Sequence, residues 1–181
     1  MKGVETMAST HQLEHWIKAT GCGDRKALEK LYDATAPAVY AIALSILKNE
    51  ADAEDVLQET FMAILGAADQ YQPQGKPMAW IITIAKNRSY KLQKQNRRYL
   101  SLVEESLPAC PFLDPDDRIL LQSCLKLLSE EEQQIVIFHA VAGCKHRQIA
   151  EVLGLPLSTV LSKYRRALKK LRTALDQEVH V

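Results

Sequence analysis

The chain has 181 residues, enough for one domain or two small ones, and its 47% of apolar residues excludes wholesale disorder. The formal net charge of +1 gives no overall indication of a polyanionic partner. The helix formers Ala, Leu, Lys, Glu and Gln dominate, and no stretch alternates β-branched residues, so we expect an all-helical protein.

The near-neutral total hides a strong segregation of charge along the chain. Seven basic and no acidic residues fall between Lys76 and Val103, and six basic and no acidic residues fall between Lys163 and Arg172. The acidic residues gather in 50–59 and 104–132. Two basic segments separated by acidic ones predict two contacts with a polyanion, and further faces that meet another partner.

The four cysteines lie far apart and form no CxxC pair. The first ten residues lack the apolar core of a signal peptide, and the longest apolar stretches are shorter than the roughly 20 residues that cross a bilayer. We therefore expect a cytoplasmic protein with reduced thiols and no membrane insertion. Cys144 and His146 form at most half of a metal site, so no metal or other cofactor is expected.

The N-terminal half predicts a bundle of helices. Apolar positions at spacings of three and four predict helix over 13–47, interrupted or restarted at Pro37. Asp52 is the predicted N-cap of the next helix, whose apolar face carries Val56, Phe61, Ile64 and Leu65. A loop over 66–77 then leads to a helix over 78–99 with an apolar first half and a basic second half.

A linker is predicted between the two halves. Three prolines and several acidic residues lie between Arg98 and Arg118, a composition that breaks helices and opposes collapse. Such a segment spans at most roughly 60 Å when extended and averages about 25 Å when fully flexible. We place a domain boundary here.

The C-terminal part, 118–175, predicts four helices that include a helix-turn-helix over 146–166. Ser129 and Glu132 form a predicted capping box, and Gly143 is expected to end the helix that follows it. In the helix-turn-helix, Gly154 takes the turn and Leu155 fills the gap between the helices. The second helix opens at Ser158 after Pro156, and the residues expected to be buried on it are Val160 and Leu168.

This second helix has the side chains that the major groove of DNA requires. Its first turns offer Ser158, Thr159, Ser162, Lys163 and Arg166, and Lys169, Lys170 and Arg172 follow where a phosphate backbone would run. Arg and Lys read guanine edges, while hydroxyls suit phosphates or bases. The alternative is an ordinary helix pair with a solvated basic face. The joint occurrence of turn glycine, plug leucine and cap favours DNA binding.

The loop and helix around residues 71–94 indicate a second nucleic-acid site. Tyr71, Trp80 and Tyr90 accompany Lys86, Arg88, Lys91 and Lys94, and rings beside a basic groove stack the bases of single-stranded DNA. Asn87 offers a hydrogen bond to a base edge. The alternative is that Trp80 and Tyr90 are core residues, which the helical spacing favours for Trp80. By charge alone, the acidic helix before this site faces solvent.

Three segments together resemble bacterial sigma factors of the sigma-70 family, in the small extracytoplasmic-function group. They read Asp52-Ala-Glu-Asp-Val-Leu-Gln-Glu-Thr-Phe61, Ala79-Trp-Ile-Ile-Thr-Ile-Ala-Lys-Asn-Arg88 and His146-Arg-Gln-Ile-Ala-Glu-Val-Leu-Gly-Leu-Pro-Leu-Ser-Thr-Val160. The resemblance covers 23–175. It implies two helical domains: sigma region 2 over 23–98 and sigma region 4 over 118–175. They would be joined by a linker over 99–117, with an N-terminal extension (1–22) and a short tail (176–181).

The resemblance also implies a function, partners and site residues. The protein would bind core RNA polymerase through the β′ clamp and the β flap, recognise and melt promoter DNA, and be controlled by an anti-sigma factor. The acidic helix would dock on the polymerase, and this replaces the earlier interpretation that it only faces solvent. The residues matched for this contact are Asp55, Gln58, Glu59 and Phe61. Those matched for the minus-ten element, where a base is flipped from the stack, are Tyr71, Lys76, Trp80, Asn87, Arg88 and Lys91. Those for the minus-thirty-five element are Ser158, Thr159, Ser162, Lys163, Arg165, Arg166 and Lys169.

The sequence departs from many relatives in the recognition helix, where Leu161 replaces a basic residue, Lys163 replaces a common Arg and Arg165 adds a charge. The promoter sequence therefore cannot be copied from a relative. The competing hypothesis is a stand-alone helix-turn-helix regulator, which would be a dimer on half-sites about 34 Å apart. An enzyme finds little support, because the sequence has no phosphate-cradling glycine loop and no HExxH.

Overall fold

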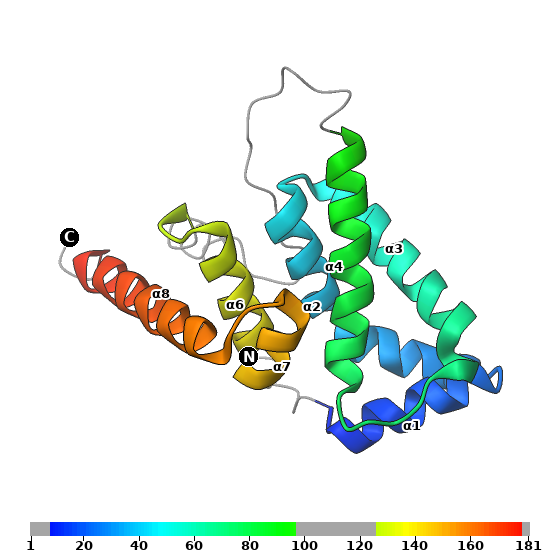
Figure 1. The fold of residues 1–181 in the computed structure, drawn as a ribbon. Helices are drawn as coiled ribbons and strands as arrows, with labels where there is room; N and C mark the ends of the chain where they lie inside the picture. The colour runs from blue at the N-terminus through cyan, green and yellow to red at the C-terminus, as the bar shows by residue number, and fades with distance from the viewer. Residues whose placement is uncertain (1–7, 97–125, 179–181) are drawn as a thin grey trace.

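A computed structural model describes residues 8–96 and 126–178, and every regular element in these two ranges is a helix (Figure 1). The all-helical prediction is therefore confirmed. The predicted linker and the helix expected to open the C-terminal part, at about residue 118, lie outside the described residues. None of the described helices is both long enough and apolar enough to cross a membrane.

The first described range forms a bundle in which α2 is the central helix. The elements are α1 (Thr10–Gly21), α2 (Arg25–Leu47), α3 (Glu50–Ala67), the 3-10 helix η1 (Ala68–Gln70) and α4 (Pro77–Asn96). Ser9 and Gln12 form a capping box at α1, and Asp24 and Asn49 cap α2 and α3 through their side chains. The bundle core includes Ile17, Leu31, Val39, Tyr40 and Ile64, none more than 1% exposed.

Several local predictions in this bundle were wrong. The helical region predicted over 13–47 breaks between α1 and α2, and residues 66–70 of the predicted loop belong to α3 and η1. Helix α2 continues through Pro37, because the surrounding turns are buried and their packing outweighs one lost backbone hydrogen bond. The N-cap of α3 is Asn49, whose side chain accepts from the Asp52 amide at 3.0 Å, so Asp52 lies in the first turn instead. Leu65 is 45% exposed while Ile64 is buried, since adjacent helical positions point about 100° apart.

The second described range contains α6 (Glu130–Ala140), α7 (His146–Leu153) and α8 (Leu157–Glu178). The Ser129–Glu132 capping box is confirmed, and Gly154 takes the left-handed conformation (φ 67°) that ends α7. Helix α6 ends earlier than predicted, at Ala140, and Gly143 lies in the turn beyond it.

Helix α8 departs from the prediction at two positions. It begins at Leu157, one residue before the predicted Ser158. Leu168 is 44% exposed, whereas Ala167 is fully buried beneath it. Adjacent helical positions point about 100° apart, so Leu168 points away from the core when Ala167 faces it.

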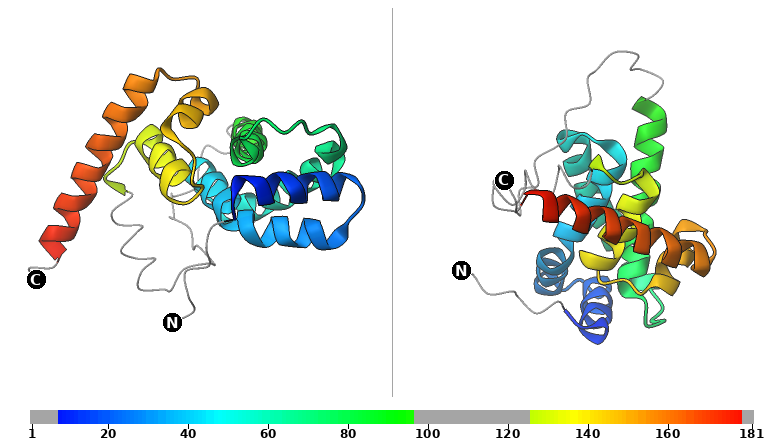
Figure 2. Two further views of the ribbon diagram at one scale, coloured as in Figure 1. Left: turned by 90° about the horizontal axis from the view of Figure 1, so that it is seen from below. Right: turned by 90° about the vertical axis from the view of Figure 1, so that its left-hand side faces the viewer.

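The two ranges pack against each other through a shared apolar cluster. Helix α2 contacts α6 and α4 contacts α7, as the views in Figure 2 also show. Ile42 and Ile82 from the first range are fully buried beside Ile135, Phe138 and Ile149 from the second. This cluster fixes the helix-turn-helix against the base of α4.

Candidate nucleic-acid interface

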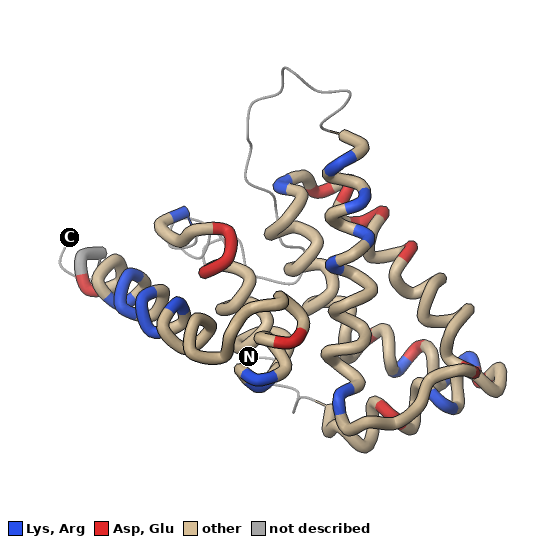
Figure 3. The backbone as a smooth tube through the Cα atoms, viewed as in Figure 1, with Lys and Arg blue, Asp and Glu red and all other residues tan. Residues whose placement is uncertain are grey.

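The recognition helix α8 presents one continuous polar and basic face to solvent. The exposed residues on it are Ser158, Ser162, Arg165, Arg166 and Lys169. Their spacings place them within about 100° of arc around the helix, opposite the fully buried Val160 and Ala167. Figure 3 shows the basic residues following one another along this helix. The predicted minus-thirty-five residues are thus brought together, except for two that lie at the edge of the face.

Those two residues, Thr159 and Lys163, are half-buried. Lys163 Nζ is 2.7 Å from Glu131 Oε2, and Lys170 Nζ is 2.6 Å from Glu132 Oε2, so acidic residues of α6 hold the side of α8. Burial alone would raise the pKa of Glu132. Hydrogen bonds from Lys170 and Ser129 and the charge of Lys170 instead hold that pKa below its ordinary value.

A second side of α8 is apolar and exposed. It carries Leu157, Leu161, Leu168 and Leu175, each between 37% and 44% exposed. Their spacings of four and seven residues place them in one stripe along the helix. The stripe offers a surface for protein contact beside the basic face.

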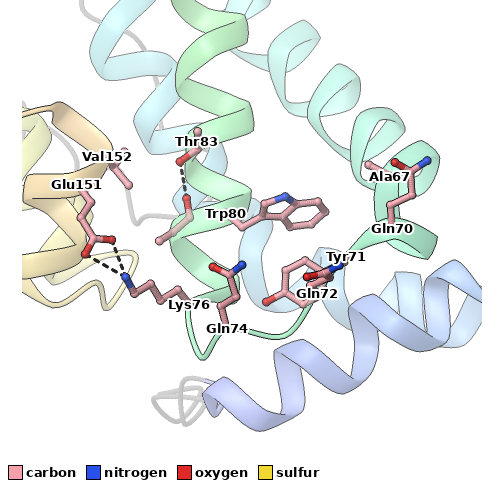
Figure 4. A pocket seen from close by; sticks show the side chains of 11 residues that line it. Ala67, Gln70, Tyr71, Gln72, Gln74, Lys76, Trp80, Thr83, Glu151 and Val152 are labelled. Carbon is pink, nitrogen blue, oxygen red and sulfur yellow. Dashed lines mark hydrogen bonds and ion pairs between the residues drawn. The ribbon is translucent and has the colours of Figure 1, made fainter.

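Three of the six predicted minus-ten residues line a cavity of 640 Å³ between the loop 71–76, α4 and α7 (Figure 4). Its lining includes Tyr71, Lys76 and Trp80, as well as Glu151 and Val152 from the helix-turn-helix. The rings of Tyr71 and Trp80 are 4.8 Å apart and tilted by 53°. Trp80 is half-buried and packs on the bundle core, so it is both a core residue and part of the cavity wall.

The loop is tied to α1 by one carboxylate. Tyr71 Oη donates to Glu14 Oε1 at 3.4 Å, and the Gly75 amide donates to the same oxygen at 2.8 Å. Burial, the Glu14 charge and this hydrogen bond raise the pKa of Tyr71 to about 12. Tyr71 therefore remains a neutral hydroxyl donor at physiological pH.

Two cations of this site are engaged by the helix-turn-helix. Lys76 Nζ lies 2.7 Å from Glu151 Oε2, and Lys86 Nζ donates to the Val152 carbonyl. Burial lowers the pKa of Lys86. These contacts join residues 66 to 75 positions apart in sequence, and no local pattern indicated them.

The remaining minus-ten candidates lie further along α4. Asn87 and Lys91 are exposed, while Arg88 Nη1 pairs with Glu59 Oε2 at 2.6 Å on α3. Tyr90, the third predicted ring, is 42% exposed, and its hydroxyl accepts from Gln134 of α6 at 2.9 Å. The basic half of α4 is therefore partly open and partly paired.

The acidic face of α3 is open to solvent. Asp55, Gln58 and Glu59 are exposed and border a shallow depression of 420 Å³ together with Met62, which is 69% exposed. Phe61 lies on the other side: it is 8% exposed and its ring centroid is 4.7 Å from that of Tyr32. Met62 was not predicted from the sequence as part of this face; flexible methionine side chains are frequent at adaptable protein-binding surfaces.

Cys144 and His146 do not belong to any larger ligand group. Among the described residues there is no cluster of three or more His, Cys, Asp or Glu side chains that could hold a metal ion. The His146 ring instead packs against His139 at 4.3 Å and Tyr164 at 4.7 Å between centroids, and Cys144 is buried. The rings of His139, His146 and Tyr164 thus pack together where α6, α7 and α8 meet.

Comparison with known proteins matches both parts of the chain. Residues 31–99 match the family model of sigma-70 region 2, and residues 118–171 match that of sigma-70 region 4. The ECF RNA polymerase sigma factor SigK of Mycobacterium ulcerans is 27% identical over 165 residues, covering 85% of this chain and 88% of that protein. RNA polymerase sigma factor CarQ of Myxococcus xanthus is 27% identical over 161 residues, covering 86% and 92%.

Solved structures show the same fold. The sigma factor RpoE from Bartonella quintana, solved with the anti-sigma factor NepR, superposes with a TM-score of 0.69 at 23% identity, covering 83% of this chain and 98% of that one. CnrH, solved with the cytosolic domain of CnrY, gives 0.65 at 24% identity, covering 92% and 98%. The family resemblance expected from the three sequence motifs is thereby confirmed: the chain belongs to the sigma-70 family and is an extracytoplasmic-function sigma factor of bacterial RNA polymerase.

Proposed function

We propose that this sigma factor uses three separate surfaces in transcription initiation. The acidic face of α3 docks on core RNA polymerase through Asp55, Gln58 and Glu59, with Phe61 supporting the helix from beneath. The cavity beside Trp80 and the open part of α4 take the melted minus-ten element. The basic face of α8 reads the minus-thirty-five element. The observation that carries this assignment is that the acidic and the two basic surfaces lie on different helices.

The minus-ten site would use its residues in distinct ways. A base leaving the stack would lie against the Tyr71 and Trp80 rings, while Lys76, Arg88 and Lys91 follow the phosphates and Asn87 contacts a base edge. Stacking on an aromatic ring contributes about 1–3 kcal/mol per base, enough to offset much of the cost of unstacking. Lys76 must be free for this, so Glu151 of α7 must withdraw from the cavity when promoter DNA enters.

The minus-thirty-five site would combine positioning and reading. Exposed Arg165, Arg166 and Lys169 are long enough to reach guanine edges or phosphates, and Ser158 and Ser162 supply short donors near the helix start. Thr159 and Lys163, at the edge of the face, would contact the flanking backbone. These roles place the first turns of α8 in the major groove.

The domain organisation follows from the same proposal. We assign 23–98 to the polymerase and minus-ten module and 118–175 to the minus-thirty-five module, with 99–117 as the tether between them. Two weak DNA contacts on one polymerase reinforce each other because each raises the effective concentration of the other. A near-neutral net charge then limits binding of the free protein to arbitrary DNA.

The exposed leucines of α8 indicate where the remaining protein partners would bind. An exposed apolar stripe beside a basic face suits a protein contact, which we assign to the β flap of the polymerase and, in the inhibited state, to an anti-sigma protein. The solved relatives named above were found with an anti-sigma factor or a cytosolic domain bound. A cytoplasmic location follows from these partners.

The test is run-off transcription with core RNA polymerase on genomic fragments of the source bacterium. Asp55→Ala should abolish core-dependent initiation, whereas Glu29→Ala, at another exposed acid, on α2, should leave it intact. Arg165→Ala should weaken promoter binding and reduce the slope of log affinity against log salt concentration by about one, the equivalent of one released counterion. A specific footprint without core and without a new transcript would refute the proposal and favour a stand-alone regulator.

A further inference from the structure

Helix α1 lies outside the 31–99 segment that matches sigma-70 region 2, yet it holds the minus-ten loop. Glu14, half-buried on α1, accepts hydrogen bonds from both ends of the loop: the Tyr71 hydroxyl at the start and the Gly75 amide near the end. No helix or strand is formed over 71–76, so the loop has no backbone ladder of its own to keep its shape. One carboxylate therefore closes it.

Helix α1 packs closely against the entrance of the loop. A Cβ built on Gly21, the last residue of α1, would lie 2.7 Å from the backbone of Ala68 and Asp69 in η1. Only glycine permits so close an approach, and η1 leads directly into Tyr71. The carboxylate of Glu14 is thus fixed in position relative to the first residue of the loop.

The two hydrogen bonds, together with packing on the bundle core, set the geometry of the cavity wall. With its hydroxyl held by α1, Tyr71 places its ring 4.8 Å from the Trp80 ring, and both line the cavity (Figure 4). Gly75, at φ +70°, turns the chain toward Lys76, which also lines the cavity. A loop released from Glu14 would lose the fixed placement of both the stacking ring and the cation.

We propose that Glu14 is a positioning residue for minus-ten recognition, acting through Tyr71 and Gly75 rather than by touching DNA. This rests on the proposed function of the cavity. Because a carboxylate would repel phosphates, Glu14 would act by shaping the site for an unpaired base. The alternative is that Glu14 only stabilises the fold, in which case its removal would weaken every activity of the protein equally.

The experiment uses holoenzyme reconstituted from the full chain and core polymerase. Fluorescent single strands carrying the minus-ten segment of a promoter mapped by run-off transcription, and the same strands with single base changes, serve as probes. Glu14→Ala should lower affinity for the matched strand by about tenfold and flatten the discrimination between bases. Glu14→Gln, which keeps the acceptor oxygen, should restore most of both. Glu29→Ala is the matched acidic control.

Further measurements separate positioning from stability. Core affinity and binding of a minus-thirty-five duplex should stay unchanged in Glu14→Ala at a temperature well below the thermal midpoint of every variant. Tyr71→Phe, which keeps the ring but removes one of the two bonds, should give a smaller loss that is not additive with Glu14→Ala. Unchanged base discrimination in Glu14→Ala, or a parallel loss of core affinity that Gln does not rescue, would overturn the proposal. If wild-type holoenzyme did not bind the strands at all, the proposed function of the cavity would be refuted together with the role of Glu14.

Discussion

Replacing Phe61 should act on stability, although the sequence motif places this residue in the polymerase contact. The ring is 8% exposed, belongs to the bundle core and packs on Tyr32. Truncating a buried Phe to Ala costs about 3–5 kcal/mol, and the exposed edge of this ring favours the lower end. Since domains are stable by about 5–15 kcal/mol in total, Phe61→Ala should leave a folded but weakened protein.

The assay is urea unfolding in parallel with core binding and run-off transcription. With a denaturant slope of about 2 kcal/mol/M, a loss of about 3 kcal/mol lowers the midpoint by about 1.5 M. Asp55→Ala, at an exposed position, should shift stability by less than about 0.5 kcal/mol while removing core binding. Phe61→Leu should retain most stability and most activity. If Phe61→Ala kept the wild-type midpoint but lost core binding, Phe61 would contact polymerase directly and the reasoning from burial would fail.

Three further predictions concern single positions. Gly21→Ala should lower the thermal midpoint by several degrees in differential scanning calorimetry, because the new Cβ meets the backbone of η1 at 2.7 Å; an unchanged midpoint would contradict the tight packing. Burial raises the pKa of the Cys144 thiol to about 11, so in peptide mapping iodoacetamide should label exposed Cys22 far faster than Cys144 in the native protein; equal rates would count against this burial. Because the pKa of Glu132 is held below its ordinary value, its charge stabilises the fold above the unfolded carboxyl pKa of about 4.3, and this contribution is lost as pH falls through the lower folded value. The difference in urea midpoint between wild type and Glu132→Gln should therefore be largest near neutral pH and vanish in acid, and a constant difference would exclude the ion pair with Lys170 as its source.

Local rules predicted the features that depend on neighbouring residues. The all-helical class, the Ser129–Glu132 capping box and the left-handed turn at Gly154 each follow from a few adjacent side chains, and each is confirmed. The same rules misplaced details where two acceptable signals compete. Asn49 and Asp52 both suit an N-cap, and only the position at which the α2–α3 turn ends selects the first.

Tertiary packing decided what sequence patterns could not. Pro37 interrupts an isolated helix, yet α2 passes through it because the neighbouring turns are buried. The contacts of Lys76 with Glu151 and of Glu14 with Gly75 join residues 75 and 61 positions apart, so no periodicity reports them. The proposed site residues were recognisable by type, but which of them are paired, buried or open depends on these distant partners.

The apolar cluster shared by the two described ranges has a practical consequence for working with pieces of the chain. A fragment ending after α4 would leave Ile42 and Ile82, both fully buried in the whole protein, facing water together with Ile46. A fragment beginning at α6 would expose Ile135 and Phe138 in the same way. Each fragment would expose a contiguous apolar surface, which favours self-association. The complementary halves, mixed together, should therefore be more soluble than either half alone.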